Sequence, residues 1–176
     1  MLLKHLMKYS RKKLVKTLVM LLFIGAFAET QAQPVEVQVY DFETFQPLLH
    51  QKNDTVYVVN FWASWCVPCL KELPDFEKLN ADYSHQNFKM ILVSLDFKSA
   101  LNSSLIPFIE KNKLKSEVVL LHAPDANAWI DKVDSDWSGA IPATLIYKND
   151  FRLFREGGYA YDELNQIVHP LINLKP

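Results

Sequence analysis

A dense apolar run that leads directly into a helical pattern is the feature that most constrains the fold of this chain. Residues 55–62 read Thr-Val-Tyr-Val-Val-Asn-Phe-Trp, which is typical of a strand buried on both faces. Between residues 67 and 83 the apolar side chains recur at helical spacing, and Pro74 predicts a kink. A buried strand followed at once by a helix indicates an α/β protein.

The remaining apolar pattern extends this unit into one domain. Further strands are predicted at residues 35–40, 88–95, 118–121, 143–147 and 151–155, and further helices at 101–112, 126–133 and 161–174. Asn149 and Asp150 lie at the tip of a hairpin between the last two strands. This order predicts an α/β fold, with a central mixed β-sheet flanked by helices on both faces. A chain of 176 residues, 49% of them apolar, is long enough to bury one core of ordinary size.

The N-terminus has the pattern of a secretory signal peptide. Residues 1–16 carry six basic residues and no acidic one, and residues 17–28 are apolar. The small residues of Ala26-Phe27-Ala28 and Thr30-Gln31-Ala32 predict cleavage near residue 28 or 32. An apolar segment this short favours a cleaved signal, because a membrane span needs about 20 residues. An uncleaved membrane anchor is the alternative.

The predicted domain boundaries follow from this leader. We expect a signal peptide at 1–28, a short N-terminal segment at 29–34 and the folded domain at 35–176. The chain beyond the leader carries 13 of the 19 basic residues and all 20 acidic residues, a net charge of −7. An acidic body argues against a nucleic-acid partner. Export to the periplasm would place the cysteines where thiol pairs tend to become oxidised.

Both cysteines lie in Trp65-Cys66-Val67-Pro68-Cys69, between the buried strand and the helix. Two thiols at i and i+3 in the first helical turn share a face and are close enough for a disulfide. The helix N-terminus stabilises a thiolate on the first of them. A zinc site would need further Cys or His ligands at suitable spacing, and a purely structural bridge would close too small a loop to stabilise much. The pattern favours a redox-active disulfide, Cys66–Cys69, that needs no metal and no cofactor.

The sequence around this pair resembles a known family. Residues 60–69, Asn-Phe-Trp-Ala-Ser-Trp-Cys-Val-Pro-Cys, resemble the active-site segment of thioredoxin-like proteins. Their continuation, Leu-Lys-Glu-Leu-Pro at 70–74, resembles the TlpA/ResA branch of exported thiol–disulfide oxidoreductases. Residues 139–144, Gly-Ala-Ile-Pro-Ala-Thr, are similar to the cis-proline loop of that family. The resemblance covers residues 35–174 and implies a thioredoxin-like fold.

The resemblance also implies roles for individual residues. Cys66 would be the nucleophile that attacks a partner disulfide, and Cys69 would resolve the mixed disulfide. Trp65 would shield the disulfide, and Pro68 would limit movement between the thiols in the first helical turn. The Ile141–Pro142 bond is expected to be cis and to present the backbone of Ile141 to the partner chain.

Two positions depart from the family pattern. Many thioredoxins carry a buried Asp where this chain has Asn60, which cannot take a proton. Some ResA-type proteins carry a carboxylate in the loop after the next strand, and Asp96 is adjacent to that place. We therefore expect Asp96, or a water molecule, to take the proton of Cys69. A solvated residue at the end of the strand is the alternative for Asp96.

Together these features predict an extracytoplasmic thiol–disulfide oxidoreductase that reduces protein disulfides. Neither Val67 nor Pro68 brings a His or a charge between the cysteines, as a strong oxidant would have. The resemblance implies apocytochrome c thiols or oxidised envelope proteins as partners, and a membrane thiol carrier as the electron donor. The alternatives are a disulfide oxidant or isomerase on the same fold, and a non-catalytic binding module whose dithiol senses redox state. A peroxidase is less favoured, because it needs a lone peroxidatic cysteine.

Overall fold

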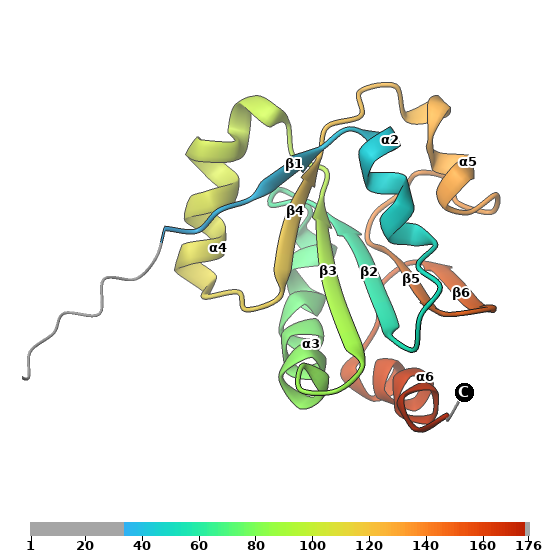
Figure 1. Cartoon of the computed structure of the whole chain (residues 1–176). Coiled ribbons are helices and arrows are strands. Elements are labelled where there is room, and N and C mark those ends of the chain that lie inside the picture. Colours follow the sequence, from blue (N-terminus) through green and yellow to red (C-terminus); the bar gives the residue numbers. More distant parts are fainter. Residues whose placement is uncertain (1–33, 175–176) are drawn as a thin grey trace, which may run out of the picture. The chain divides into compact units, whose positions relative to one another are not determined.

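The computed structural model describes residues 34–174. From Val35 onward these residues build a six-stranded sheet with strand order β1-β4-β3-β2-β5-β6 (Figure 1). The strands are β1 (Gln38–Tyr40), β2 (Val56–Trp62), β3 (Phe88–Ser94), β4 (Glu117–Leu121), β5 (Ala143–Lys148) and β6 (Phe151–Glu156). The first four strands pair in parallel, whereas β5 is antiparallel to β2 and β6 is antiparallel to β5. The predicted mixed sheet is confirmed.

Helices cover both faces of the sheet, as predicted. They are α2 (Phe42–Phe45), α3 (Val67–Tyr83), α4 (Ile106–Asn112), α5 (Ile130–Val133) and α6 (Tyr161–Asn173). Helices α3, α4 and α6 supply side chains to the core on one face, and α2 and α5 supply side chains to the core on the other. Figure 1 shows α2 and α5 on the opposite side of the sheet from α3 and α6.

Strand β2 lies inside the sheet because both of its faces are apolar. Val58 and Trp62 belong to the core beneath α3, whereas Val59 and Phe61 belong to the aromatic core beneath α2 and α5. This alternation follows from the two-residue repeat of a strand. Asn60 shares the α3 side with Val58 and Trp62, so a fully buried polar side chain lies beneath the first turns of α3.

Two predicted helices differ in the structure. Residues 101–112 were expected to form one helix, but Leu101–Leu105 form a π-helical turn and the α-helix begins at Ile106. Pro107 lies in the first turn of α4. Proline has no backbone N–H, so it is tolerated in a first turn but would interrupt the hydrogen bonds inside a longer α-helix. Residues 126–133 are divided in the same way into a 3₁₀ turn and α5, with Trp129 in a non-helical conformation between them.

The sequence patterns missed α2 and the 3₁₀ turn after it, Gln46–Leu49. The side chain of Asp41 accepts a hydrogen bond from the backbone N–H of Thr44 at 2.8 Å and caps α2. A four-residue helix has too few repeats to leave a helical period in the sequence. In contrast, α3 has the predicted bounds and is assigned as one helix through Pro74.

The predicted leader and its cleavage sites lie outside the described residues, as do residues 29–33. The signal peptide and the domain boundary therefore stay predictions. Within residues 34–174, no helix is both long enough and apolar enough to cross a bilayer.

Candidate active site

The two cysteines form a disulfide where β2 leads into α3. Their Cα atoms are 5.3 Å apart, a usual separation for a disulfide. Cys66 is the N-cap of α3 in an extended conformation, and its Sγ accepts from the backbone N–H of Cys69 at 3.3 Å. Pro68 occupies the first turn, where its missing N–H removes no helical hydrogen bond. The sulfur of Cys66 therefore lies in the field of the helix N-terminus, which favours a thiolate after reduction.

The two sulfurs differ in how far solvent reaches them. Cys66 is 5% exposed and Cys69 is fully buried. Trp65, next to Cys66, has 62% of its surface exposed and is open to contact with another molecule. An approaching thiol or disulfide therefore meets Cys66 first, which is the order that the sequence predicts for attack and resolution.

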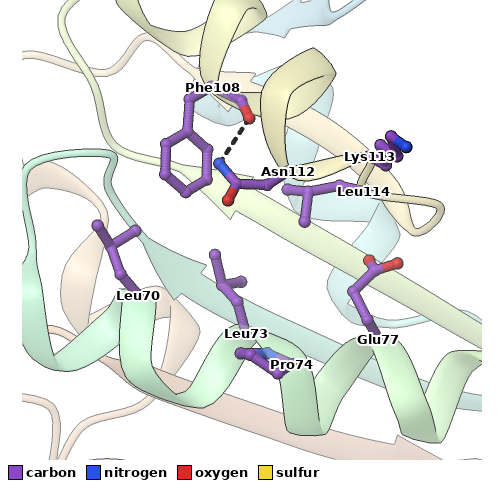
Figure 2. A pocket seen from close by; sticks show the side chains of 8 residues that line it. All are labelled: Leu70, Leu73, Pro74, Glu77, Phe108, Asn112, Lys113 and Leu114. Carbon is purple, nitrogen blue, oxygen red and sulfur yellow. Dashed lines mark hydrogen bonds between the residues drawn. The ribbon is translucent and has the colours of Figure 1, made fainter.

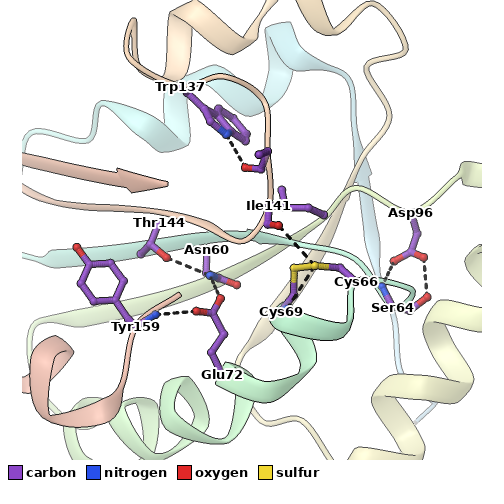
Figure 3. The surroundings of a disulfide bond; sticks show 11 residues. Asn60, Ser64, Cys66, Cys69, Glu72, Asp96, Trp137, Ile141, Thr144 and Tyr159 are labelled. Atoms are coloured by element: carbon purple, nitrogen blue, oxygen red, sulfur yellow. Dashed lines mark hydrogen bonds between the residues drawn. A yellow bond between two sulfur atoms is a disulfide. The ribbon is translucent and has the colours of Figure 1, made fainter. Parts of the chain in front are cut away.

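The Ile141–Pro142 peptide bond is cis, which confirms that prediction. The carbonyl oxygen of Ile141 lies 3.7 Å from Cys66 Sγ, so the loop before β5 faces the disulfide (Figure 3). Backbone and side-chain donors hold the loop on both sides. Gly157 N–H donates to the Pro142 carbonyl at 2.8 Å, and the Trp137 indole N–H donates to the Ala140 carbonyl at 2.8 Å.

Asp96 is buried on the other side of Cys66, in the loop that follows β3. Its carboxylate accepts from the backbone N–H of Ser64 at 2.9 Å, from the Ser64 hydroxyl at 2.6 Å and from the Ser94 hydroxyl at 2.8 Å. These contacts tie the end of β3 to the segment just before Cys66 (Figure 3). The contacts suit a positioning role, and the proton-transfer role of Asp96 stays a prediction.

The buried carboxylate nearest in sequence to the dithiol is Glu72, for which the sequence patterns predicted no role. Glu72 lies one helical turn after Cys69 on α3 and is 5% exposed. Its Oε1 accepts from Asn60 Nδ2 at 2.8 Å, and its Oε2 accepts from the backbone N–H of Tyr159 at 2.9 Å (Figure 3). Gly158 lets the chain pass close by, because a Cβ there would lie 3.2 Å from Oε2. Cys69 and Glu72 share the buried face of α3, and that spacing was the available sequence signal.

The surroundings of Glu72 shift its pKa toward neutral pH. Burial raises the pKa of Glu72 from its usual 4.5 to about 6. The N–H of Tyr159, the amide of Asn60 and the charge of Arg155 all lower this pKa, whereas Asp75 raises it. Glu72 can therefore take up and release a proton close to physiological pH, which the amide of Asn60 cannot do.

Two of the hollows in the described part of the chain border segments next to the dithiol, one through Asp96 and the other through Leu70. One of about 510 Å³ lies where β3 and β4 end and includes Phe97, His122 and Trp129 in its lining. A second, of about 240 Å³, lies between α3 and α4 and is lined by Leu70, Leu73, Pro74, Glu77, Phe108, Asn112, Lys113 and Leu114 (Figure 2). Neither lining contains Cys66 or Cys69, so the reacting sulfurs lie outside both hollows.

Comparison with known proteins agrees with this geometry. The family model described as "AhpC/TSA family" matches residues 12–153. The chain is 32% identical over 121 residues to sporulation thiol-disulfide oxidoreductase A of Bacillus subtilis, which covers 62% of this chain and 70% of that protein. Over 39 residues it is 44% identical to the thiol-disulfide oxidoreductase ResA of Oceanobacillus iheyensis, a match that covers 22% of this chain and 20% of that protein.

Solved structures share the fold. A thioredoxin family thiol:disulfide interchange protein from Chlorobium tepidum superposes with a TM-score of 0.57 at 19% identity, over 68% of this chain and 81% of that one. StoA from Bacillus subtilis superposes with a TM-score of 0.51 at 24% identity, over 67% of this chain and 84% of that one. At these identities the likeness establishes the thioredoxin-like fold.

Proposed function

Because the chain belongs to the AhpC/TSA family and is a thiol–disulfide oxidoreductase, we propose that it reduces protein disulfides outside the cytoplasm. One observation carries the proposal: a disulfide whose outer sulfur, on Cys66, caps a helix and faces the Ile141 carbonyl, while its inner sulfur, on Cys69, is buried. This arrangement suits a two-step exchange, in which one thiol attacks and the other resolves.

The reaction would proceed through a mixed disulfide. The thiolate of Cys66 attacks a sulfur of the substrate disulfide, and one substrate cysteine leaves as a thiolate. Cys69 then loses its proton and attacks Cys66 Sγ, which re-forms the Cys66–Cys69 disulfide and releases the second substrate thiolate. A thiol carrier in the membrane would restore the dithiol by the reverse exchange.

We propose that Glu72 is the base that accepts the proton of the Cys69 thiol. Cys69 is fully buried, so its thiol needs a base within the protein to become a thiolate. Glu72 lies one turn further along the same helix face, and burial holds its pKa at about 6. A base with this pKa is mostly ionised at pH 7 and still binds a proton strongly enough to accept one from a thiol.

The surface around the disulfide supports a protein as the substrate. Trp65, Val67 and Phe97 are three of the five large apolar side chains exposed among residues 34–174, with exposed fractions of 62%, 63% and 76%. The loop of Phe97 is tied to the segment of Trp65 through Asp96. Exposed apolar side chains around a reactive sulfur favour docking of another protein chain. The Ile141 backbone would add pairing to an extended segment of that chain.

The direction of the exchange is tested by the reduction potential. Neither Val67 nor Pro68 carries a charge that would stabilise a Cys66 thiolate further, which supports a reductase. We expect a potential nearer the −270 mV of a reductant than the −120 mV of a strong oxidant, measured by equilibration with glutathione or dithiothreitol. A value near −120 mV would replace the reductase with a disulfide oxidant. Catalytic reduction of insulin would exclude a module that only senses redox state.

The location and the partner need separate tests. Residues 1–28 support export, and an intact mass that begins after Ala28 or Ala32 would establish cleavage. A mass that includes Met1 would instead indicate an uncleaved anchor or no export. The variant Cys69→Ser should stall the mixed disulfide on Cys66 in the native cell. Mass spectrometry of that adduct would test whether apocytochrome c, or another envelope protein, is the substrate.

A further inference from the structure

One buried oxygen beside the dithiol has no hydrogen-bond partner within residues 34–174. Asn60 is fully buried on β2, and its Oδ1 atom accepts no hydrogen bond. In contrast, Nδ2 of the same side chain donates both of its hydrogens, to Glu72 Oε1 at 2.8 Å and to Thr144 Oγ1 at 3.0 Å. Nearly all buried polar atoms in proteins have a partner, so an amide that satisfies only one end calls for a chemical explanation.

Glu72 determines which way the amide of Asn60 faces. An ionised carboxylate only accepts hydrogen bonds, so the NH₂ group of Asn60 must face it. The oxygen then lies on the opposite side of the amide, and in Figure 3 it is directed toward the side chain of Cys69. Cys69 is fully buried and forms part of the disulfide, so in this oxidised form its sulfur has no hydrogen to donate.

We propose that Asn60 is a positioning residue for the resolving step, and that its amide turns over when the proton of Cys69 moves to Glu72. The proposal rests on the proposed function of the dithiol. It explains the unpartnered oxygen as the acceptor for a thiol hydrogen that exists only in the reduced protein.

The amide of Asn60 would have one orientation when the proton is on Cys69 and the opposite orientation when the proton is on Glu72. While Glu72 is ionised and Cys69 is a thiol, Oδ1 of Asn60 accepts from the Cys69 S–H, and Nδ2 donates to Glu72 and Thr144. When Glu72 is protonated and Cys69 is a thiolate, a half-turn about the Cβ–Cγ bond lets Nδ2 donate to the thiolate. Oδ1 then accepts from the Glu72 O–H and from the Thr144 hydroxyl, which can rotate to donate.

The half-turn matters because the site is buried. All four residues of this network, Asn60, Cys69, Glu72 and Thr144, are at most 5% exposed. Without the turn, a protonated Glu72 and the amide NH₂ would direct two donors at each other, and the thiolate would lack a donor. An unpaired charge in such a site is costly, so the amide lowers the cost of forming the thiolate.

The proton and electron balance of the step is closed within the site. Cys69 gives its proton to the Glu72 carboxylate and becomes a thiolate. The thiolate attacks Cys66 Sγ, so that the Cys66–Cys69 bond forms, the bond from Cys66 to the substrate sulfur breaks, and the substrate leaves with the electron pair as a thiolate. Glu72 then returns its proton to solvent or to the departing thiolate.

Other charged groups act on Glu72 from the elements packed around it. Asp75 on α3 raises the pKa of Glu72, and Arg155 on β6 lowers it. Arg155 is itself paired with Glu163 at 2.8 Å and lies over the ring of Tyr159 at 4.3 Å. Asp75 and Arg155 are unchanged in a variant at Asn60. A shift in the pH profile of such a variant is therefore due to the loss of the Asn60 amide.

The test follows the two thiols separately in the full protein. Reduced protein mixed with 5,5′-dithiobis(2-nitrobenzoate) releases one thionitrobenzoate when Cys66 attacks and a second when Cys69 resolves the adduct. We expect Asn60→Leu to slow the second release at least tenfold at pH 7 and to shift its pH profile upward by one unit or more. The first release should stay within about twofold of wild type. Asn112→Leu is the matched control, because Asn112 is an exposed asparagine on α4 outside this network, and it should leave both releases and the pH of half-maximal second release in place.

The outcomes separate this proposal from the function it rests on. If wild type shows no first release, Cys66 is not a reactive thiol and the proposed function fails. If wild type shows both releases and Asn60→Leu matches it at every pH, the role of Asn60 is wrong while the function stands. Asn60→Leu should also add little to Glu72→Gln, because the amide acts through Glu72, and additive effects would contradict the coupling.

A measurement on the wild-type protein covers the case in which Asn60→Leu does not fold. The side-chain amide signals of Asn60 in ¹⁵N NMR spectra should move when the disulfide is reduced and should titrate together with Glu72. The exposed Asn112, whose Nδ2 donates to the Phe108 carbonyl at 2.8 Å, is the internal control and should move in neither case. Asn60 signals that stay fixed through both changes would overturn the proposal.

Discussion

Replacing Glu72 by Gln should stabilise the oxidised protein while it impairs catalysis. The pKa of Glu72 is about 6 in the folded chain against an ordinary 4.5. The folded chain therefore binds more protons than the unfolded chain between these pH values. The contribution of Glu72 to the free energy of unfolding therefore falls as pH rises from about 4.5 to about 6, and stays lower at higher pH. The difference of about 1.5 pH units, at 1.36 kcal/mol per unit, corresponds to about 2 kcal/mol.

Glutamine removes this penalty, because it has no charge to desolvate. We expect Glu72→Gln to raise the free energy of unfolding by about 2 kcal/mol at pH 7.5 and by much less at pH 4. Urea denaturation of the two oxidised proteins across this range measures the difference directly. Other carboxylates, such as Asp54 and Asp82, have a lowered pKa in the folded chain and stabilise it less in acid. Their contributions are the same in wild type and in Glu72→Gln, so they cancel in the difference between the two free energies of unfolding.

The matched control is Glu110→Gln, because Glu110 is an exposed glutamate on α4. This substitution should change the free energy of unfolding by less than about 0.5 kcal/mol at any pH. Parallel curves for wild type and Glu72→Gln from pH 4 to pH 7.5 would refute the raised pKa of Glu72. The assignment of Glu72 as the base for Cys69 would then lose its physical support.

Three further substitutions have defined outcomes. Phe97→Ser removes the large apolar side chain that is most exposed among residues 34–174, at 76%, and should slow insulin reduction several-fold, with a much smaller effect on a low-molecular-weight disulfide. Phe76→Ala opens a cavity in the core beneath α3 and should cost about 3–5 kcal/mol in urea denaturation. Lys148→Met leaves the last carbonyls of α6 and the carboxylate of Asp54 without their ammonium donor. It should cost about 2 kcal/mol, and hydrogen exchange should become faster in the last turn of α6.

Local patterns in the sequence were sufficient for the part of the site that lies on consecutive residues. The run at 55–62, the helical period at 67–83 and the two cysteines between them are neighbours in the chain, so strand, disulfide and helix could be predicted together. The cis bond at Ile141–Pro142 was predicted from a motif that resembles a family, and not from any local physical rule. The short α2 was missed, and so was the division of the predicted helix at 101–112, because they depend on Asp41 and Pro107, single residues that change no period.

Which carboxylate lies behind the dithiol was decided only by the tertiary structure. In the sequence, Glu72 is one polar residue on a helix, three positions after Cys69, and Asp96 is one at the end of a strand. The spacing of Glu72 from Cys69 is a local signal, but it does not show how far either carboxylate is buried or which donors it meets. Folding brings Tyr159, 87 residues away, to donate to Glu72, and brings β2 beneath it with the amide of Asn60. The proton affinity of a carboxylate depends on how much water it loses and on which donors replace that water. Because those donors come from distant segments of the chain, only their packing together gives Glu72 a pKa near 6.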